Sequence, residues 1–292
     1  MDKRWDILGV GCTAVDDLLY VINYPPADAK IAVQRRERQC GGLAATALVA
    51  AARQEAQCAY AGALGHDELS AFVLKAMLDE GIDVSPAGHH SSAGPFHSTI
   101  IVDQTVHTRN IFFTGPEIVG PLPTAPSEDT VRAARVLLVD HYGGEATVRA
   151  QRLARQANIP IVADLERNDR PAFAEILRYS DHLIISERFA ASLTGREAPD
   201  DAAAALLGPD RRVVVVTCGA GGCWAIEQGE SKPRHYAAFA VQTVDTTGCG
   251  DTFRFLDLVV SDAVNSASAW NWSWHFLSRQ PGIGGAEYQS TG

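Results

Sequence analysis

Short apolar runs separated by polar turns recur through the first part of the chain. The run from Trp5 to Val15 is rich in Ile, Leu and Val, which is typical of a buried strand. Two alternating segments, Leu18–Tyr24 and Ile31–Arg38, flank a Pro-Pro-Ala-Asp turn and predict a hairpin that stands off the core. The same patterns predict a helix from Gly42 to Ala52, a strand at Cys58–Leu64, a helix at Glu68–Glu80, and a strand pair at Ser98–Val102 and Asn110–Thr114.

From Val131 onward, apolar strand patterns alternate with helical patterns. This alternation predicts an α/β fold with a doubly wound, mainly parallel sheet that has helices on both faces. A returning strand is expected at Cys223–Ile226, which argues against a dinucleotide-binding turn at Gly219–Gly222. The remaining elements are strands at Val136–Val139, Ile159–Asp164, His182–Ser186 and Val213–Cys218, and helices at Ala146–Ala157, Arg170–Tyr179 and Glu187–Leu193.

Composition and charge exclude several classes of function. The chain has 292 residues, of which 46% are hydrophobic and 21% charged, and its net charge of −10 argues against a nucleic-acid partner. It contains no apolar stretch of the roughly 20 residues that a membrane span needs and no signal-peptide core, so a cytoplasmic protein is expected. Six cysteines are scattered without a close pair, which favours reduced core residues over disulfides or a zinc site.

The clearest candidate for chemistry is Val244–Phe253, which reads VDTTGCGDTF. A strand pattern runs into a glycine turn and then into a helical pattern that starts at Asp251. Free amides at such a helix start can bind a phosphate, and the carboxylate could take a proton from an attacking hydroxyl. The alternative is an ordinary glycine turn with Asp251 as the helix N-cap.

This segment resembles the D-T-x-G-A-G-D signature of the PfkB/ribokinase-like carbohydrate kinases, with Cys249 in the usual alanine position. The resemblance implies that Asp251 is the catalytic base and that Gly248, Cys249 and Gly250 form an anion hole for the transferred phosphoryl group. It further implies ATP and Mg²⁺ as cofactors, a sugar as acceptor, and a homodimer formed through a small β lid from residues 17–37 and 93–115.

Residues 9–84 are similar to the N-terminal half of the same family, and closest to its ketohexokinase-like members. By that match Asp16 binds sugar hydroxyls, and Gly41 and Gly42 approach the sugar. Leu43 and Thr46 stand where family members commonly carry Asn, so the sugar specificity does not carry over, although Thr46 remains a substrate-binding candidate. The alternative for Asp16 is a plain turn residue at the end of a strand.

Two further segments extend the resemblance, and a third departs from it. Arg109 resembles a lid arginine near the transferred phosphate, although a solvated arginine at a strand edge is an equal alternative. The V-T-x-G-x-x-G element makes Thr217, Gly219 and Gly222 candidate ATP contacts, with a plain glycine hairpin as the alternative. Many members carry N-x-x-E after the strand that ends at Ser186; here Phe189 replaces the Glu, so the metal ligands stay unknown.

The C-terminal tail departs from the family. The expected kinase domain covers residues 1–265, and residues 266–292 form an atypical tail whose loop-like composition is compatible with disorder. Three of the five tryptophans lie within Trp270–Trp274. A shifted reading frame in the source gene and a divergent C-terminus are the two explanations.

The sequence therefore predicts ATP-dependent phosphorylation of a sugar hydroxyl. One alternative is a nucleoside kinase of the same superfamily, which Leu43 would favour by making the pocket flatter and more apolar. The other is a relative whose catalysis is impaired by the altered tail and which only binds a sugar or nucleotide.

Overall fold

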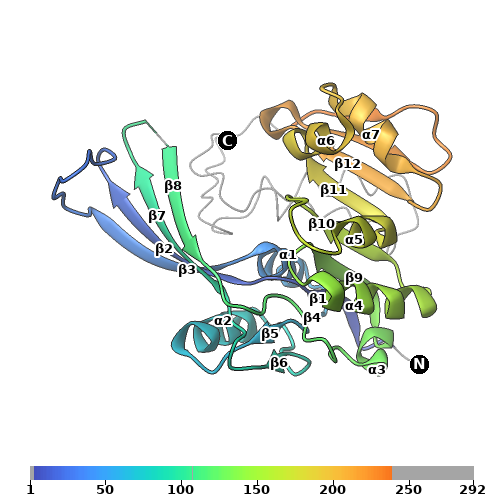
Figure 1. The fold of residues 1–292 in the computed structure, drawn as a ribbon, viewed down its shortest axis with the longest axis horizontal. Coiled ribbons are helices and arrows are strands. Elements are labelled where there is room, and N and C mark those ends of the chain that lie inside the picture. Colours follow the sequence, from blue (N-terminus) through green and yellow to red (C-terminus); the bar gives the residue numbers. More distant parts are fainter. Residues whose placement is uncertain (1–2, 107, 239–292) are drawn as a thin grey trace.

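The computed structural model describes residues 3–106 and 108–238. These residues are arranged around a large β-sheet and a smaller one (Figure 1). The large sheet has eight strands in the order β14-β13-β12-β11-β10-β9-β1-β4. Every pairing from β4 to β12 is parallel, and β13 and β14 add antiparallel strands at the other edge. The strands are β1 (Trp5–Val10), β4 (Cys58–Tyr60), β9 (Ala134–Asp140), β10 (Ile161–Asp164), β11 (His182–Ser186), β12 (Val213–Thr217), β13 (Cys223–Glu227) and β14 (Arg234–Tyr236).

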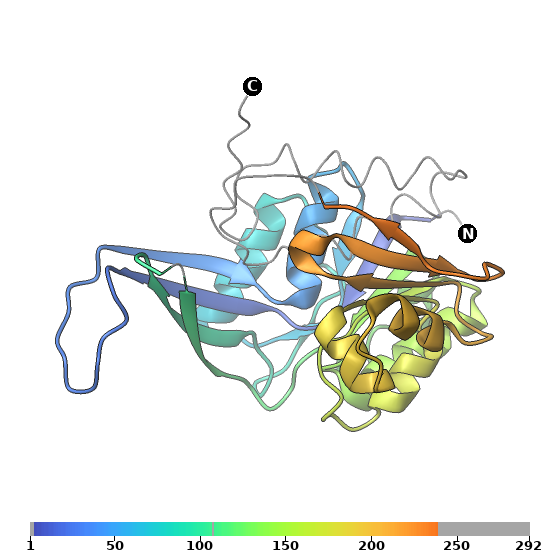
Figure 2. The same cartoon turned by 90° about the horizontal axis from the view of Figure 1, so that it is seen from above.

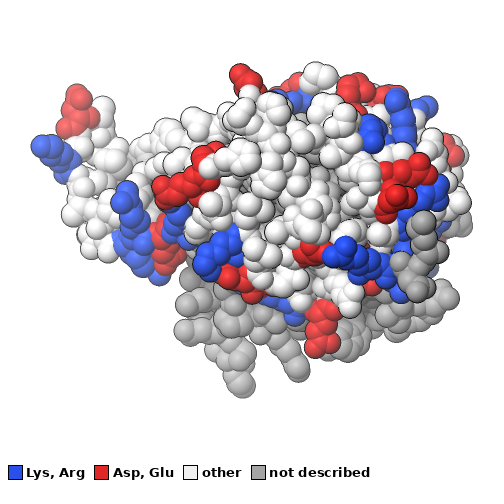
Figure 3. Space-filling view, turned by 90° about the horizontal axis from the view of Figure 1, so that it is seen from below, with Lys and Arg blue, Asp and Glu red and all other residues white. Residues whose placement is uncertain are grey.

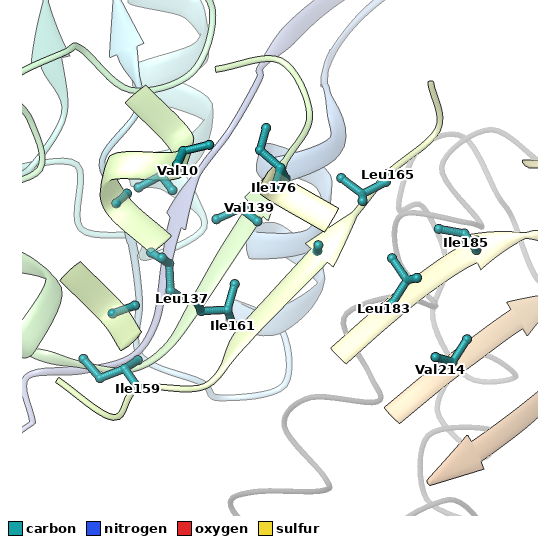
Figure 4. Close-up of a cluster of buried hydrophobic side chains, with 14 of the residues drawn as sticks. Val10, Leu137, Val139, Ile159, Ile161, Leu165, Ile176, Leu183, Ile185 and Val214 are labelled. Atoms are coloured by element: carbon teal, nitrogen blue, oxygen red, sulfur yellow. The ribbon is translucent and has the colours of Figure 1, made fainter. Parts of the chain in front are cut away.

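Helices cover both faces of the large sheet, because its buried strands send alternate side chains to opposite sides. Leu137 and Val139 join the cluster in Figure 4, which packs under α3 to α7, whereas Val136 and Leu138 join the cluster under α1 and α2. The predicted doubly wound α/β fold is therefore confirmed. The helices are α1 (Leu43–Ala52), α2 (Glu68–Asp79), α3 (Glu128–Arg132), α4 (Gly144–Gln156), α5 (Phe173–Tyr179), α6 (Glu187–Thr194) and α7 (Pro199–Leu207).

The smaller sheet stands away from the large one (Figures 1 and 2). Its four strands are β3 (Arg35–Gly41), β2 (Ala14–Val21), β7 (Phe96–Asp103) and β8 (Thr108–Thr114), in that order across the sheet. The β2–β3 and β7–β8 pairings are antiparallel, and β2 pairs parallel with β7. Leu18, Tyr20 and Ile100 form a small buried cluster of its own. A further short parallel pair joins β5 (Ala63–Leu64) to β6 (Gly88–His89).

The order of strands reverses between β1 and β9. The next strand of the large sheet, β4, lies on one side of β1. The chain then crosses to the other side of β1, where β9, β10, β11 and β12 follow in order. In open parallel sheets, ligands bind beyond the carboxyl ends of the strands at such a reversal. The fold therefore directs attention to the residues that follow Val10 and Val139.

Several predicted elements differ from the structure. The strand expected at Cys58–Leu64 is divided between β4 of the large sheet and β5 of the short pair. The hairpin strand expected at Ile31–Arg38 begins only at Arg35, as β3. The strand expected at Trp5–Val15 is two strands, because the chain leaves the large sheet after Val10 and enters the smaller sheet at Ala14. Asp16 consequently lies inside β2 and not at the end of a strand of the large sheet. The helix expected at Arg170–Tyr179 begins only at Phe173, because Ala172 takes a left-handed conformation with φ of 65°.

Several elements carry no clear sequence pattern. The short helix α3, the helix α7 and the edge strand β14 were not predicted, and neither was the parallel β2–β7 pairing. By contrast, the strand pair at Ser98–Val102 and Asn110–Thr114 and the returning strand at Cys223–Ile226 are confirmed as β7, β8 and β13. Of the missed features, α3 and β14 are short, and the β2–β7 pairing joins distant segments.

The surface and the cysteines agree with the composition. On the face seen in Figure 3, Lys and Arg side chains are interspersed with Asp and Glu. Within residues 3–106 and 108–238, no helix has the length and apolar character required to cross a membrane. No disulfide joins the five cysteines in this part of the chain.

Candidate active site

A buried carboxylate joins the carboxyl ends of β1 and β9. Asp140, the last residue of β9, accepts hydrogen bonds from the amides of Cys12 at 2.6 Å and Tyr142 at 2.9 Å. A Cβ atom at Gly11 would lie 2.3 Å from Oδ2 of Asp140, so only glycine leaves room for the carboxylate. Burial raises the pKa of Asp140, and the neighbouring His141 acts in the opposite direction. Asp140 therefore fixes the junction at which the strand order reverses.

A histidine and a tyrosine follow this carboxylate. His141 is completely buried, and neither ring nitrogen has a hydrogen-bond partner among the residues that the structure describes. Desolvation lowers the pKa of His141, which keeps the imidazole neutral near pH 7. Its ring centroid lies 4.1 Å from that of Tyr142, and the Tyr142 ring lies 4.8 Å from Phe96 of β7. The large sheet and the smaller sheet thus meet through Tyr142.

Asp16 lies on β2 beside this meeting point. It is half-buried, and the β-ladder pairs it with Ser98 and Gln39 on the neighbouring strands. Burial raises the pKa of Asp16, while a hydrogen bond from the Ser98 side chain lowers it. A Cβ atom at Gly41 would lie 2.5 Å from Oδ2 of Asp16, so the absence of a side chain there makes space for the carboxylate. Desolvation in this position suits a carboxylate that accepts hydrogen bonds from a ligand.

The turn into α1 packs against the chain that leaves β1. Gly42 has φ of 95° and ψ of 147°, and a Cβ atom there would lie 2.5 Å from Cα of Thr13. The amide of Thr46 donates to the Gly42 carbonyl at 2.9 Å, and its side chain is buried. The structure therefore gathers four predicted residues, Asp16, Gly41, Gly42 and Thr46, around one backbone junction.

Leu43 does not form a pocket wall on its own. It is 7% exposed and packs as the first residue of α1, although it stands where the family commonly has an amide side chain. A side chain that is almost fully buried adds little apolar surface to a binding site.

The predicted ATP-contact residues form a tight turn after β12. The amide of Cys218 donates to the Gly222 carbonyl at 2.8 Å, and Gly222 has φ of 85°. A Cβ atom at Gly222 would lie 2.0 Å from the carbonyl oxygen of Tyr236. The Thr217 hydroxyl donates to the Ile185 carbonyl at 3.4 Å, and Gly219 is exposed. The turn lies at the carboxyl ends of the parallel strands, as does the β1–β9 junction. β12 is three strand positions from β9, so the turn and the junction are about 14 Å apart at the usual strand spacing.

The residues that replace N-x-x-E have structural roles. Ser186 caps α6 by accepting a hydrogen bond from the amide of Phe189 at 3.3 Å, and the Phe189 ring packs against Phe173 in the core. Among residues 3–106 and 108–238, no group of three or more His, Cys, Asp or Glu side chains could hold a metal ion.

Arg109 is not brought beside Asp16. It pairs with Val102 on β7, whereas the row of Asp16 and Ser98 continues to Phe113 on β8. Arg109 lies four positions before Phe113 on β8, which places it about 13 Å farther along the strand.

The predicted base and anion hole, with Asp251 and residues 248–250, lie outside the described residues, as does the tail.

Sequence reasoning missed Asp140, His141 and Tyr142. A signal was present, because the polar residues follow the apolar run Val136–Val139 directly. The same argument from strand ends that selected Asp16 would have selected Asp140.

Comparison with known proteins decides the family. Residues 11–254 match the family described as pfkB family carbohydrate kinase, which is more than half of the chain. The chain belongs to the pfkB family of carbohydrate kinases. It is therefore a phosphotransferase that transfers a phosphoryl group from ATP to a sugar hydroxyl.

Individual relatives agree with this assignment. The chain is 27% identical to the ribokinase of Mus musculus over 227 residues, covering 73% of this chain and 68% of the relative. It is 27% identical to fructokinase-1 of Zea mays over 245 residues, covering 76% and 74%. The expected closeness to ketohexokinase-like members stays a prediction.

Solved structures confirm the ribokinase-like fold. A putative ribokinase from Agrobacterium tumefaciens superposes with a TM-score of 0.84 and 25% identity, covering 92% of this chain and 89% of the other. Arabidopsis thaliana ribokinase, solved with ribose and ATP, gives a TM-score of 0.77 with 21% identity over 94% and 90%.

Proposed function

We propose that this kinase binds its sugar at the junction of β1, β2 and α1, with Asp16 accepting hydrogen bonds from sugar hydroxyls. The position of Asp16 supports this role, because its carboxylate is half-buried beside Gly41, on the strand that follows β1 along the chain. Gly41 and Gly42 let the backbone approach the sugar closely, and Thr46 lines the same turn from the first helical turn of α1.

Asp251 is the proposed general base, and the amides of Gly248, Cys249 and Gly250 the proposed anion hole. The sequence VDTTGCGDTF supports this assignment. A carboxylate beside the attacking hydroxyl would take its proton as the oxygen attacks the γ-phosphorus. Backbone amides would then stabilise the charge on the phosphoryl oxygens, which is the dominant need in phosphoryl transfer.

ATP is proposed to bind along the carboxyl edge toward β12, with its base side near Thr217, Gly219 and Gly222. The place of these residues supports this arrangement, because they lie at the same carboxyl ends of the parallel strands as the β1–β9 junction, about 14 Å from it. Mg²⁺ is proposed to enter with the nucleotide, held mainly by phosphates and water, since the described residues supply no ligand set of their own.

The burial of Leu43 favours a sugar over a nucleoside as acceptor. A flat apolar pocket that would suit a nucleobase was expected only if the Leu43 side chain lined it, and that side chain is 7% exposed.

The smaller sheet is proposed to act as a lid and to carry a homodimer contact. The loop over residues 22–34 lies at its far end (Figure 2), and its apolar side chains are exposed. These side chains are Ile22, Tyr24, Ile31 and Val33. Light scattering of the wild type and of an Ile31→Asp, Val33→Asp double variant tests the contact. A dimer that becomes a monomer in the variant is expected, and a monomeric wild type would contradict it.

The proposed acceptor is tested by a panel of sugars and nucleosides with ATP, followed by ³¹P NMR of the products. Sugar-dependent formation of ADP and of one sugar phosphate is expected. Transfer to nucleosides alone would establish the nucleoside alternative, and no transfer to any acceptor would indicate an impaired relative.

A further inference from the structure

Three aromatic side chains from separate segments meet at the base of the smaller sheet. Phe96 starts β7, Phe113 lies near the end of β8, and Tyr142 follows β9 of the large sheet. The ring centroids of Phe96 and Phe113 are 6.0 Å apart at an edge-on angle of 79°, and those of Phe96 and Tyr142 are 4.8 Å apart. We name Phe96, Phe113 and Tyr142 the aromatic platform.

The β-ladder places this platform on the face of the sheet that carries Asp16. Asp16 pairs with Ser98 on β7, and Ser98 pairs with Phe113 on β8. Directly paired residues on neighbouring strands point to the same face, so Asp16, Ser98 and Phe113 form one row across the sheet. Phe96 lies two residues before Ser98 and shares this face. Asp16, the proposed sugar-binding residue, and the aromatic platform therefore lie on the same face of the smaller sheet, in neighbouring rows.

The exposure of the platform leaves apolar surface uncovered. Phe113 is 57% exposed, and Phe96 and Tyr142 are half-buried. Leaving a Phe side chain in water costs free energy in proportion to its apolar area, so covering it by a ligand is favourable. Gly115 supports the arrangement, because a Cβ atom there would lie 2.5 Å from Cε1 of Phe96 and would displace the ring.

The opposite face of β8 provides a contrast. Phe112 is 56% exposed, almost the same as Phe113, but it pairs with Thr99 and therefore lies on the other face. That other face also carries Asp17, whose carboxylate accepts hydrogen bonds from Arg38 and lies 2.8 Å from Nε2 of His97. Arg38 in turn contacts Glu68 at the start of α2, so the charged groups of this face pair with one another.

We propose that the aromatic platform binds the C–H face of the sugar ring while Asp16 binds its hydroxyls. This inference rests on the proposed sugar site at Asp16. A sugar ring presents weakly positive C–H hydrogens on one face and hydroxyls at its rim, and the face of an aromatic ring carries the complementary negative charge. The platform would therefore select acceptors with a continuous C–H patch, and a hydroxyl that projects from that patch would weaken binding.

The test compares two matched substitutions, Phe113→Ser and Phe112→Ser. Both remove an exposed ring of the same strand, so losses of strand propensity are alike, and thermal unfolding and light scattering check the fold and the assembly of each. Sugar affinity is measured by calorimetry with the sugar that gives the highest turnover in the panel above. Phe113→Ser is expected to weaken the sugar affinity about tenfold, and Phe112→Ser less than about twofold. Phe113→Tyr, which keeps an aromatic ring, should keep the wild-type affinity.

Saturation-transfer NMR gives a readout that does not depend on turnover. When the aromatic protons of the wild type are irradiated, the C–H protons of the bound sugar should receive saturation, and this transfer should fall in Phe113→Ser. Equal affinities in Phe113→Ser and Phe112→Ser, with the wild type still phosphorylating its sugar, would overturn the platform alone. A wild type that phosphorylates no sugar in the panel would overturn the proposed function as well.

Discussion

Replacing Gly42 by alanine should damage both the fold and the sugar site. Gly42 has φ of 95° and ψ of 147°, a region that residues with a side chain rarely adopt, and this strain costs about 1–3 kcal/mol. The new Cβ atom would also lie 2.5 Å from Cα and 2.6 Å from the carbonyl carbon of Thr13. Backbone atoms cannot move aside as a flexible side chain can, so either β2 or α1 must shift. We expect a total loss of about 3–5 kcal/mol of unfolding free energy, out of a typical 5–15 kcal/mol.

Gly81→Ala is the matched control for this substitution. Gly81 ends α2 with φ of 77°, and nothing lies within 4 Å of a Cβ atom built there. It therefore carries the cost of positive φ without the collision, about 1–2 kcal/mol. Urea unfolding of both variants and of the wild type gives the free energies, and calorimetry gives the sugar affinity. Gly42→Ala should be the less stable variant and should alone lose sugar affinity. Equal stability and equal affinity in the two variants would refute the close packing of the Gly42 turn.

Three further predictions concern the sugar ligand, the smaller sheet and the tail. Asp16→Ala should weaken sugar binding at least about tenfold by calorimetry while leaving ATP affinity nearly unchanged, because each lost hydrogen bond to a charged group costs about 1.5–3 kcal/mol; an unchanged sugar affinity would make Asp16 a structural residue. The hydrogen bond from Arg38 lowers the pKa of Asp17 to about 2, so its stabilisation is complete above the unfolded pKa of about 3.9 and is lost as the pH falls toward 2. The gap in urea midpoint between wild type and Arg38→Gln should therefore shrink over that range, and a constant gap would contradict it. A chimera whose residues after Phe253 come from an intact relative should show higher turnover and ATP affinity than this chain, and equal values would make the tail a functional variant.

The fold was predictable where a segment of the sequence carries a strong local pattern. Mainly apolar runs such as Val136–Val139 and Val213–Cys218 are long enough to indicate buried parallel strands, and Gly42 marks a helix start. The break after Val10 was not predictable, because the apolar run continues through Cys12 to Val15 without a turn residue other than Gly11. What bends the chain there is the distant carboxylate of Asp140, which binds the Cys12 amide.

The site was predictable only in part, for a similar reason. Glycines such as Gly42 and Gly222 are visible locally, because both have a positive φ, a backbone conformation that other residues rarely adopt. The row of Asp16, Ser98 and Phe113 depends on the parallel pairing of β2 with β7, which are separated by the whole of α1 and α2. No local pattern specifies the register of such a distant pair.

The most direct test of the account is turnover of Asp251→Asn with the best sugar acceptor and ATP. The amide is nearly isosteric with the carboxylate but cannot take the proton, and a general base contributes about 10²–10⁴-fold. We expect sugar phosphate formation to fall by at least about 10²-fold, while calorimetry shows ATP bound almost as tightly as in the wild type. Wild-type turnover in purified Asp251→Asn would contradict the assignment of the catalytic base.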